Sequence, residues 1–250
     1  MARDAMAGGA TWRVPEELPV AFVYNRRNYA VMLATPADMD DFSIGFSLTE
    51  QVVSHVNEIK SVDIHQTDRG IELHISIDDE RLERLDIQQR RRNLVGRAGC
   101  GVCGLENAET FFEKLPQVSK SPAVLDTKAL VGALLNIEKF QPLNASTRSA
   151  HAAAWVDPAG TIQFAREDVG RHNALDKLLG AGVRDGVDFR QGFLLMSSRC
   201  SYEIVEKAAR LGVPAIASIS APTAFAIRKA AEANISLYAR SGETFALVNG

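Results

Sequence analysis

Two cysteines separated by two residues, Cys100 and Cys103, offer the most specific chemistry in the sequence. They lie in the stretch 96–104, which contains four glycines and shows neither helical nor strand periodicity. Glycine-rich segments of this kind form mobile surface loops. A thiol pair in such a loop can bind a metal ion, exchange disulfides, or carry sulfur as a persulfide.

These three roles make different demands on the residues around the pair. Four-coordinate zinc needs two further thiolate or imidazole ligands, but Cys200 stands alone and the histidines are scattered. A redox Cys-x-x-Cys motif usually lies at the start of a helix, and Gly101 and Gly104 disfavour a helix there. Sulfur relay needs an accessible thiolate, which the charge of Arg97 favours. Sulfur relay therefore fits best, and two buried structural cysteines are the alternative.

A second group of polar residues follows predicted strands in the carboxyl-terminal half. The group comprises Arg171, His172, Ser198, Arg199 and Thr223. In open α/β sheets ligands bind at the carboxyl ends of strands, and a helix N-terminus favours phosphate. We therefore predict one shared crevice for an anionic nucleotide. The alternative is that Asp168 or Gly170 only caps a helix and that His172 packs locally.

The cysteine pair lies near the end of an amino-terminal α+β region, which we assign to residues 18–120. Two apolar runs flank a turn containing Asn25 and Asn28, which predicts a hairpin of strands. Thr35 is predicted to cap a helix whose first position is Pro36. The later predicted elements are strands at 59–65 and 71–77 and a charged helix at 79–91. Residues 1–17 are expected to be a flexible tail.

Strands alternate with helices in residues 121–250, which predicts an α/β domain with a sheet covered on both faces. The predicted elements are helix 127–140, strands 151–156 and 161–166, helix 171–179, strand 193–197, helix 202–211, strand 214–219, helix 222–233 and strand 235–239. This order is that of a three-layer cytidine-deaminase-like domain, here joined to the smaller α+β region. Such an architecture does not decide the chemistry.

The composition excludes several classes of protein. The 250 residues are 46% hydrophobic and 24% charged, which suits a globular protein with a substantial core. A net charge of −3 gives no global sign of nucleic-acid binding. We find neither a membrane span nor a secretory signal. Three cysteines do not form a disulfide framework, so we expect the reducing cytoplasm.

The motifs together resemble one family, the formate dehydrogenase accessory sulfurtransferases (FdhD). The resemblance runs from about Leu18 to the C-terminus. It is carried by the cysteine loop 96–104, by 34–50, by Glu167-Asp-Val-Gly-Arg-His-Asn-Ala-Leu-Asp-Lys177, by Ser197-Ser-Arg199, by Ser201-Tyr-Glu203 and by Ser220-Ala-Pro-Thr223.

The resemblance implies a sulfur carrier that matures formate dehydrogenase. Such a protein accepts persulfide sulfur from a cysteine desulfurase and passes it to the molybdenum cofactor, bis-molybdopterin guanine dinucleotide. The family's persulfide cysteine corresponds to Cys100, and Cys103 is its partner. The family's cofactor-binding segment corresponds to Tyr238, Ala239, Arg240, Ser241, Gly242 and Glu243. Glu243 departs from the family, which commonly has a basic residue there, and a carboxylate does not favour phosphate.

Two rival functions share parts of this pattern. A zinc deaminase has the same order of elements but needs His-x-Glu and Pro-Cys-x-x-Cys at two helix starts. Here the catalytic glutamate and a ligand cysteine are missing at Arg171-His172-Asn173 and Arg199-Cys200-Ser201. We therefore expect no tightly bound metal, and Cys200 is expected to be a small packed side chain. A chaperone that binds the cofactor without moving sulfur would share the crevice but would not need Cys100. The sequence leaves open whether the chain forms a homodimer.

Overall fold

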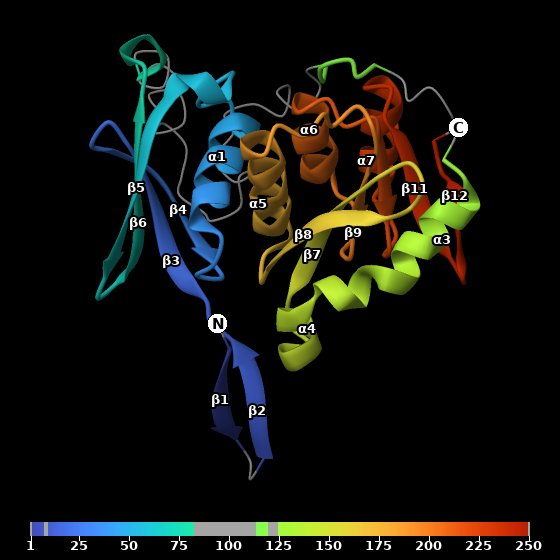
Figure 1. Cartoon of the computed structure of the whole chain (residues 1–250), viewed down its shortest axis with the longest axis horizontal. Helices are drawn as coiled ribbons and strands as arrows, with labels where there is room; N and C mark the ends of the chain where they lie inside the picture. Colours follow the sequence, from blue (N-terminus) through green and yellow to red (C-terminus); the bar gives the residue numbers. More distant parts are fainter. Residues whose placement is uncertain (1, 8–9, 83–113, 120–124, 250) are drawn as a thin grey trace.

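The computed structural model shows a four-stranded and a six-stranded sheet with helices packed between and outside them, together with a separate two-stranded sheet (Figure 1). The described residues are 2–7, 10–82, 114–119 and 125–249. Within these ranges, no helix combines the length and the apolar character needed to span a membrane. The loop with Cys100 and Cys103 lies outside the described residues, as does the predicted boundary at 120 and 121.

A four-stranded sheet and one helix form the amino-terminal layer. The strands, in the spatial order β4-β3-β6-β5, are β3 (Leu18–Tyr24), β4 (Arg27–Ala34), β5 (Ile59–Thr67) and β6 (Gly70–Ile77). Helix α1 (Met39–Thr49) covers the inner face, where Phe42 and Phe46 pack on Phe22. The short 3-10 helix η1 (Val56–Glu58) precedes β5. The predicted hairpin and both later strands are thus confirmed, with boundaries shifted by up to two residues.

The start of α1 was predicted wrongly. Thr35 does not cap the helix, which begins at Met39 with Asp38 at the N-cap in the left-handed region (φ 55°). Thr35 is 1% exposed and its polar groups bond residues near position 168 instead. Hydrogen bonds to residues distant in the sequence therefore occupy Thr35, which the local sequence had predicted to cap the helix. Residues 79–82 are helical, as predicted, and the rest of that charged helix lies outside the described residues.

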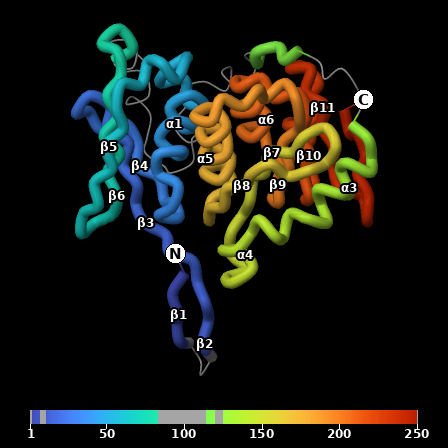
Figure 2. The backbone as a smooth tube through the Cα atoms, viewed as in Figure 1, coloured from blue at the N-terminus to red at the C-terminus, as the bar shows by residue number. Residues whose placement is uncertain are grey.

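The segment before residue 18 also differs from expectation. Strands β1 (Ala2–Ala7) and β2 (Ala10–Pro15) pair antiparallel there, where we predicted only a flexible tail. The hairpin projects from the body of the protein (Figures 1 and 2) and leaves Met6 and Trp12 exposed. Its short strands alternate too weakly in hydrophobicity to be recognised by pattern.

The carboxyl-terminal sheet has six strands in the order β12-β11-β10-β9-β7-β8. The strands are β7 (His151–Val156), β8 (Ile162–Asp168), β9 (Phe193–Met196), β10 (Ala215–Ser218), β11 (Ser236–Ser241) and β12 (Thr244–Leu247). Strands β9, β10 and β11 are parallel, and β7 and β8 form the predicted hairpin at one edge. The α/β prediction is confirmed, whereas β12 at the other edge was missed.

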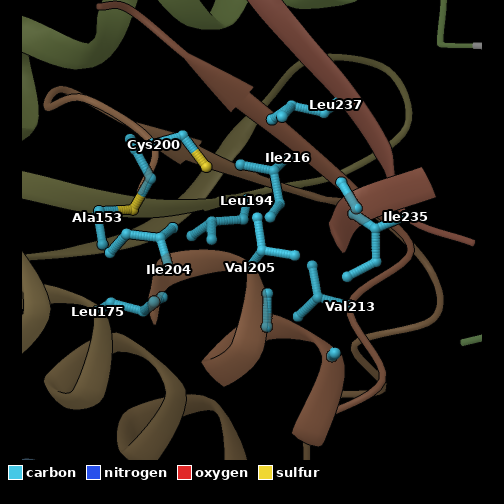
Figure 3. Close-up of a cluster of buried hydrophobic side chains, with 14 of the residues drawn as sticks. Ala153, Leu175, Leu194, Cys200, Ile204, Val205, Val213, Ile216, Ile235 and Leu237 are labelled. Atoms are coloured by element: carbon cyan, nitrogen blue, oxygen red, sulfur yellow. The ribbon is translucent and has the colours of Figure 1, made fainter. Parts of the chain in front are cut away.

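Helices cover both faces of this sheet and complete the three layers. They are α3 (Thr127–Asn136), η3 (Ile137–Phe140), α4 (Pro142–Thr147), α5 (Arg171–Arg184), α6 (Tyr202–Arg210) and α7 (Ala224–Glu232). Alternate strand residues face opposite ways. Leu194 and Ile216 lie on the face that packs against α5, α6 and α7 (Figure 3), while Leu195 and Ala217 lie on the opposite face and pack against α3. The short α4 was not predicted.

The two sheets are joined by the contact of α1 with α5, which lie side by side (Figure 2). Two glycines permit this close approach. A Cβ atom on Gly45 would lie 1.7 Å from the Asp176 carbonyl oxygen, and one on Gly180 would lie 1.9 Å from the Asp41 carbonyl oxygen. No larger side chain fits at either glycine. The glycines therefore let α1 pack directly against α5, the helix that begins at the predicted crevice.

Candidate functional site

Most residues of the predicted crevice meet at one end of the strands of the six-stranded sheet, where β8, β9 and β10 have their carboxyl ends; we call this the carboxyl edge of the sheet. The parallel strands β9 and β10 end there together, since Met196 pairs with Ser218. Strand β8 also ends there, because its last residue Asp168 pairs with His151 at the start of the antiparallel strand β7. Arg171 and Arg199 follow directly after β8 and β9. The topology therefore brings together side chains that are far apart in the sequence.

Two of the helices that begin at this edge lack a side-chain cap. The N-cap residue of α5 is Gly170 and that of α6 is Ser201, and neither side chain accepts a bond from its helix. Uncapped first-turn N–H groups and the helix dipole favour an anion. Helix α7 differs, because the Thr223 hydroxyl accepts a bond from Ala226 N at 3.1 Å. Thr223 thus caps α7 through its hydroxyl oxygen, and its predicted role in ligand binding stays a prediction.

Positive charge gathers at the same edge. Burial lowers the pKa of His151, and the nearby Arg171 and Arg199 guanidinium groups lower it further. The Nε atom of Arg171 is buried and lacks a hydrogen-bond acceptor among the described residues. A buried donor without an acceptor costs free energy unless a ligand or water satisfies it. Arg171, Arg199 and His151 together can therefore receive an anion.

His151 was missed in the sequence, although a signal for it existed. It is the first residue of a predicted strand that pairs antiparallel with the next one. In such a hairpin the start of the first strand lies beside the end of the second. His151 could therefore have been placed beside Asp168 from the predicted hairpin alone.

His172 joins the starts of α5 and α6. Its Nε2 atom lies 3.5 Å from Ser201 Oγ and 3.7 Å from Glu203 Oε2. The His172 contact, aided by Ser201, lowers the pKa of Glu203 to about 2 despite partial burial. Glu203 is therefore ionised at neutral pH, and the His172 ring already contacts two side chains of the same chain.

Ser198 has a structural place. It is 3% exposed, and its hydroxyl donates to the Arg199 carbonyl oxygen at 3.1 Å. The Ser198 carbonyl in turn accepts a bond from Ser218 Oγ at 2.9 Å. These bonds hold the loop after β9 in place and keep the Ser198 side chain away from solvent. Ser198 is therefore buried and hydrogen-bonded within the protein, and its predicted contact with a ligand stays a prediction.

The predicted cofactor-binding segment divides into a buried and an exposed part. Tyr238 is 3% exposed, packs on the α3 side of the sheet and accepts a bond from Leu125 N at 3.1 Å. In this position its ring is covered by the protein and is not exposed for stacking on a base. Ala239 is also buried. The exposed residues are Arg240, Ser241, Gly242 and Glu243.

These four exposed residues form the end of β11 and its turn to β12. Gly242 has a φ of +63°, and its carbonyl oxygen accepts a bond from Arg240 Nε at 2.8 Å. Because β10 and β11 are parallel, this turn follows the same sheet edge as Arg171 and Arg199. The exposed part of the segment thus lies at the same end of the strands as the positive cluster, with β10 between β11 and β9.

Cys200 follows the carboxyl end of β9, close to the positive cluster in the sequence, but its side chain lies within the core. It is 0% exposed, and Figure 3 shows it among apolar side chains under the sheet. Burial raises the pKa of its thiol to about 12. The expectation of a packed side chain is confirmed. Among the described residues no group of three histidine, cysteine or acidic side chains is arranged to hold a metal.

Known proteins resemble this chain over nearly its whole length. The model of the FdhD/NarQ family matches residues 15–246. The chain is 48% identical over 224 residues to "Sulfur carrier protein FdhD" of Xanthomonas euvesicatoria pv. vesicatoria (strain 85-10), covering 90% of this chain and 79% of the relative. It is 45% identical over 231 residues to the protein of the same name from Cupriavidus necator, covering 92% and 79%.

A solved structure shows the same fold. The crystal structure of a formate dehydrogenase accessory protein from Desulfotalea psychrophila matches with a TM-score of 0.73. The match covers 100% of this chain and 96% of that chain at 21% sequence identity. At this identity the likeness supports the architecture described above and nothing finer.

Proposed function

The chain belongs to the FdhD/NarQ family, and on that basis we propose that it is a sulfur carrier for formate dehydrogenase maturation. Cys100 accepts sulfur from a cysteine desulfurase, and the crevice binds the acceptor, bis-molybdopterin guanine dinucleotide, through a guanine nucleotide portion. The relay operates in the reducing cytoplasm, where the thiols stay free to react.

The sulfur chemistry balances as two exchanges at the loop. The Cys100 thiolate attacks the terminal sulfur of the desulfurase persulfide, so the donor S–S bond breaks and the desulfurase thiolate leaves. The Cys100 persulfide then loses its terminal sulfur as sulfide when the Cys103 thiolate attacks the Cys100 sulfur. This step leaves a Cys100–Cys103 disulfide, which a cellular dithiol reduces. Both thiols are thus used, although only Cys100 carries the transferred atom.

The observation that supports nucleotide binding is the positive cluster between two uncapped helices. Arg171 has a buried Nε without an acceptor among the described residues, Arg199 and His151 lie beside it, and α5 and α6 both begin there. The phosphates of a guanine dinucleotide supply the acceptors that this arrangement lacks. Arg240 lies near the end of β11, at the same end of the strands, and can contact a more distant part of a dinucleotide.

Calorimetry with GDP and GMP tests the crevice. Each charge-assisted contact contributes about 1.5–3 kcal/mol, so Arg171→Ala should weaken binding roughly ten- to a hundredfold. Arg190→Ala is the matched control, because Arg190 precedes β9 at the opposite edge and pairs with Asp188 at 2.8 Å. Binding that is absent at millimolar nucleotide, or equal in wild type and Arg171→Ala, would refute the crevice.

Intact mass spectrometry tests the relay. After incubation with a desulfurase and cysteine, the wild type should gain one sulfur atom and Cys100→Ala should gain none. Cys103→Ala should still gain sulfur but should release no sulfide. Cys100→Ala should also abolish formate dehydrogenase maturation. If it retained maturation, the protein would instead be a cofactor-binding chaperone that does not move sulfur.

A further inference from the structure

Thr35 joins the amino-terminal layer to the turn that precedes Arg171. Its hydroxyl oxygen accepts a bond from Val169 N at 3.2 Å. Its backbone N–H donates to Asp168 Oδ2 at 2.9 Å, and its carbonyl oxygen accepts a bond from Lys177 Nζ at 2.8 Å. All three polar groups of this one residue therefore contact β8, α5 or the turn between them, more than 130 positions away in the sequence.

Asp168 is the centre of this connection. Its Oδ2 atom pairs with Lys177 Nζ at 2.6 Å, and both side chains are 0% exposed. Its Oδ1 atom accepts bonds from Gly170 N at 2.8 Å and from Asn173 Nδ2 at 3.0 Å. The same Asn173 amide donates to the Leu33 carbonyl oxygen at 2.8 Å. The turn from β8 into α5 is thus tied to the end of β4 by several buried bonds.

The position of Arg171 depends on this turn. Arg171 is the first residue of α5 and follows Asp168, Val169 and Gly170 without a break. Of the bonds that hold the turn, only the one to Val169 N comes from the Thr35 side chain. We propose that Thr35 is a positioning residue of the crevice, whose hydroxyl holds the turn so that Arg171 and the first turn of α5 face the nucleotide phosphate. This inference rests on the proposed nucleotide-binding function.

A second buried threonine provides a matched comparison. Thr49, at the other end of α1, is fully buried, and its hydroxyl donates to Asp176 Oδ1 at 2.7 Å and accepts a bond from Lys207 Nζ at 2.9 Å. It also links α1 to α5 and α6, but it contacts the middle of α5. Loss of its hydroxyl should lower stability without moving the start of that helix.

The test compares Thr35→Val, Thr35→Ser and Thr49→Val in the full chain. Valine keeps the shape of threonine and removes the acceptor for Val169 N, whereas serine keeps the acceptor. Thr35→Val should bind GDP roughly three- to tenfold more weakly, as expected for one lost hydrogen bond. Thr35→Ser and Thr49→Val should bind GDP like the wild type, although Thr49→Val should melt at a lower temperature.

His151 gives a readout that needs no nucleotide. Its neighbours are Arg171, Arg199, Asp168 and His172, and among these charges Arg171 lowers its pKa the most. If the turn moves Arg171 away, NMR titration should show a higher His151 pKa in Thr35→Val and an unchanged value in Thr49→Val.

The outcomes separate the two proposals. Failure of the wild type to bind GDP, with the His151 pKa raised only in Thr35→Val, would overturn the proposed function and leave the positioning of Arg171 supported. Normal GDP affinity in Thr35→Val, or an unchanged His151 pKa, would show that the Thr35 bonds serve stability alone. Equal losses of affinity in Thr35→Val and Thr49→Val would also overturn the inference.

Discussion

Replacing Lys207 by methionine should remove the charge at the centre of the contact between α1, α5 and α6. The Lys207 ammonium lies 2.8 Å and 2.9 Å from the Asp176 carboxylate oxygens, 2.9 Å from Thr49 Oγ1 and 3.0 Å from Glu50 Oε1. It also lies 5.6 Å from the centre of the Phe46 ring. Methionine keeps the apolar stem but leaves the Asp176 carboxylate buried, with Thr49 as its one remaining hydrogen-bond partner among the described residues.

The loss should be large, because an unpaired buried charge remains. Removing one partner of a buried ion pair costs about 3–5 kcal/mol. For a chain of this size each kcal/mol lowers the melting temperature by about 2–4 °C, so Lys207→Met should melt about 6–20 °C below wild type. Lys60→Met is the control: Lys60 pairs with Asp78 at 2.7 Å on the surface, and such pairs contribute about 0–1 kcal/mol.

The loss should also depend on pH. Burial raises the pKa of Asp176, and the nearby Lys207 and Thr49 offset part of this rise. Burial would lower the pKa of Lys207, but Asp176 and Glu50 together raise it. Without the ammonium the pKa of Asp176 should rise further. A carboxyl with a raised folded-state pKa favours folding when protonated, so its contribution is lost as pH rises through that pKa.

Thermal and urea denaturation at pH 5 and pH 8 measure both effects. Lys207→Met should lose more stability at pH 8 than at pH 5, and adding Asp176→Asn should recover much of the loss at pH 8. The reasoning fails if Lys207→Met melts like Lys60→Met, or if its loss of stability is the same at both pH values.

Four further measurements test the site and the packing. In a Cys100→Ala/Cys103→Ala variant, Cys200 should not react with thiol reagents until the protein unfolds, because it is buried with a pKa of about 12; rapid labelling in the native state would contradict this. Binding of phosphate or GDP should raise the lowered pKa of His151, so affinity should increase as pH falls from the His151 pKa in the complex to its lower pKa in the free protein; a pH-independent affinity would count against the cluster. Gly180→Ala should cost about 1–3 kcal/mol or more by separating α1 from α5. Gly132→Ala on α3, where a Cβ meets nothing, should gain about 0.5–1 kcal/mol in chemical denaturation.

Local patterns in the sequence were enough to place most elements of the fold. The alternation of strands and helices in residues 121–250 predicted the order of β7 to β11, because hydrophobic periodicity and helix length are properties of neighbouring residues. The parallel arrangement then followed from the helices that connect successive strands, because a crossover helix returns the chain to the same end of the sheet. That arrangement placed Arg171 and Arg199 at one edge before any contact was known. The family could also be named, because its motifs are continuous stretches of sequence.

The tertiary structure decided what individual side chains do. Thr35 has the residue type of a helix cap, yet its hydroxyl bonds Val169, and Tyr238 lies in a predicted binding segment, yet its ring is buried against α3. His151 belongs to the positive cluster only because β7 and β8 pair. In each case the deciding partner is distant in the sequence. Burial and hydrogen bonding depend on which elements pack together. The packing of the elements is determined by the core as a whole and not by the residues adjacent to Thr35, Tyr238 or His151.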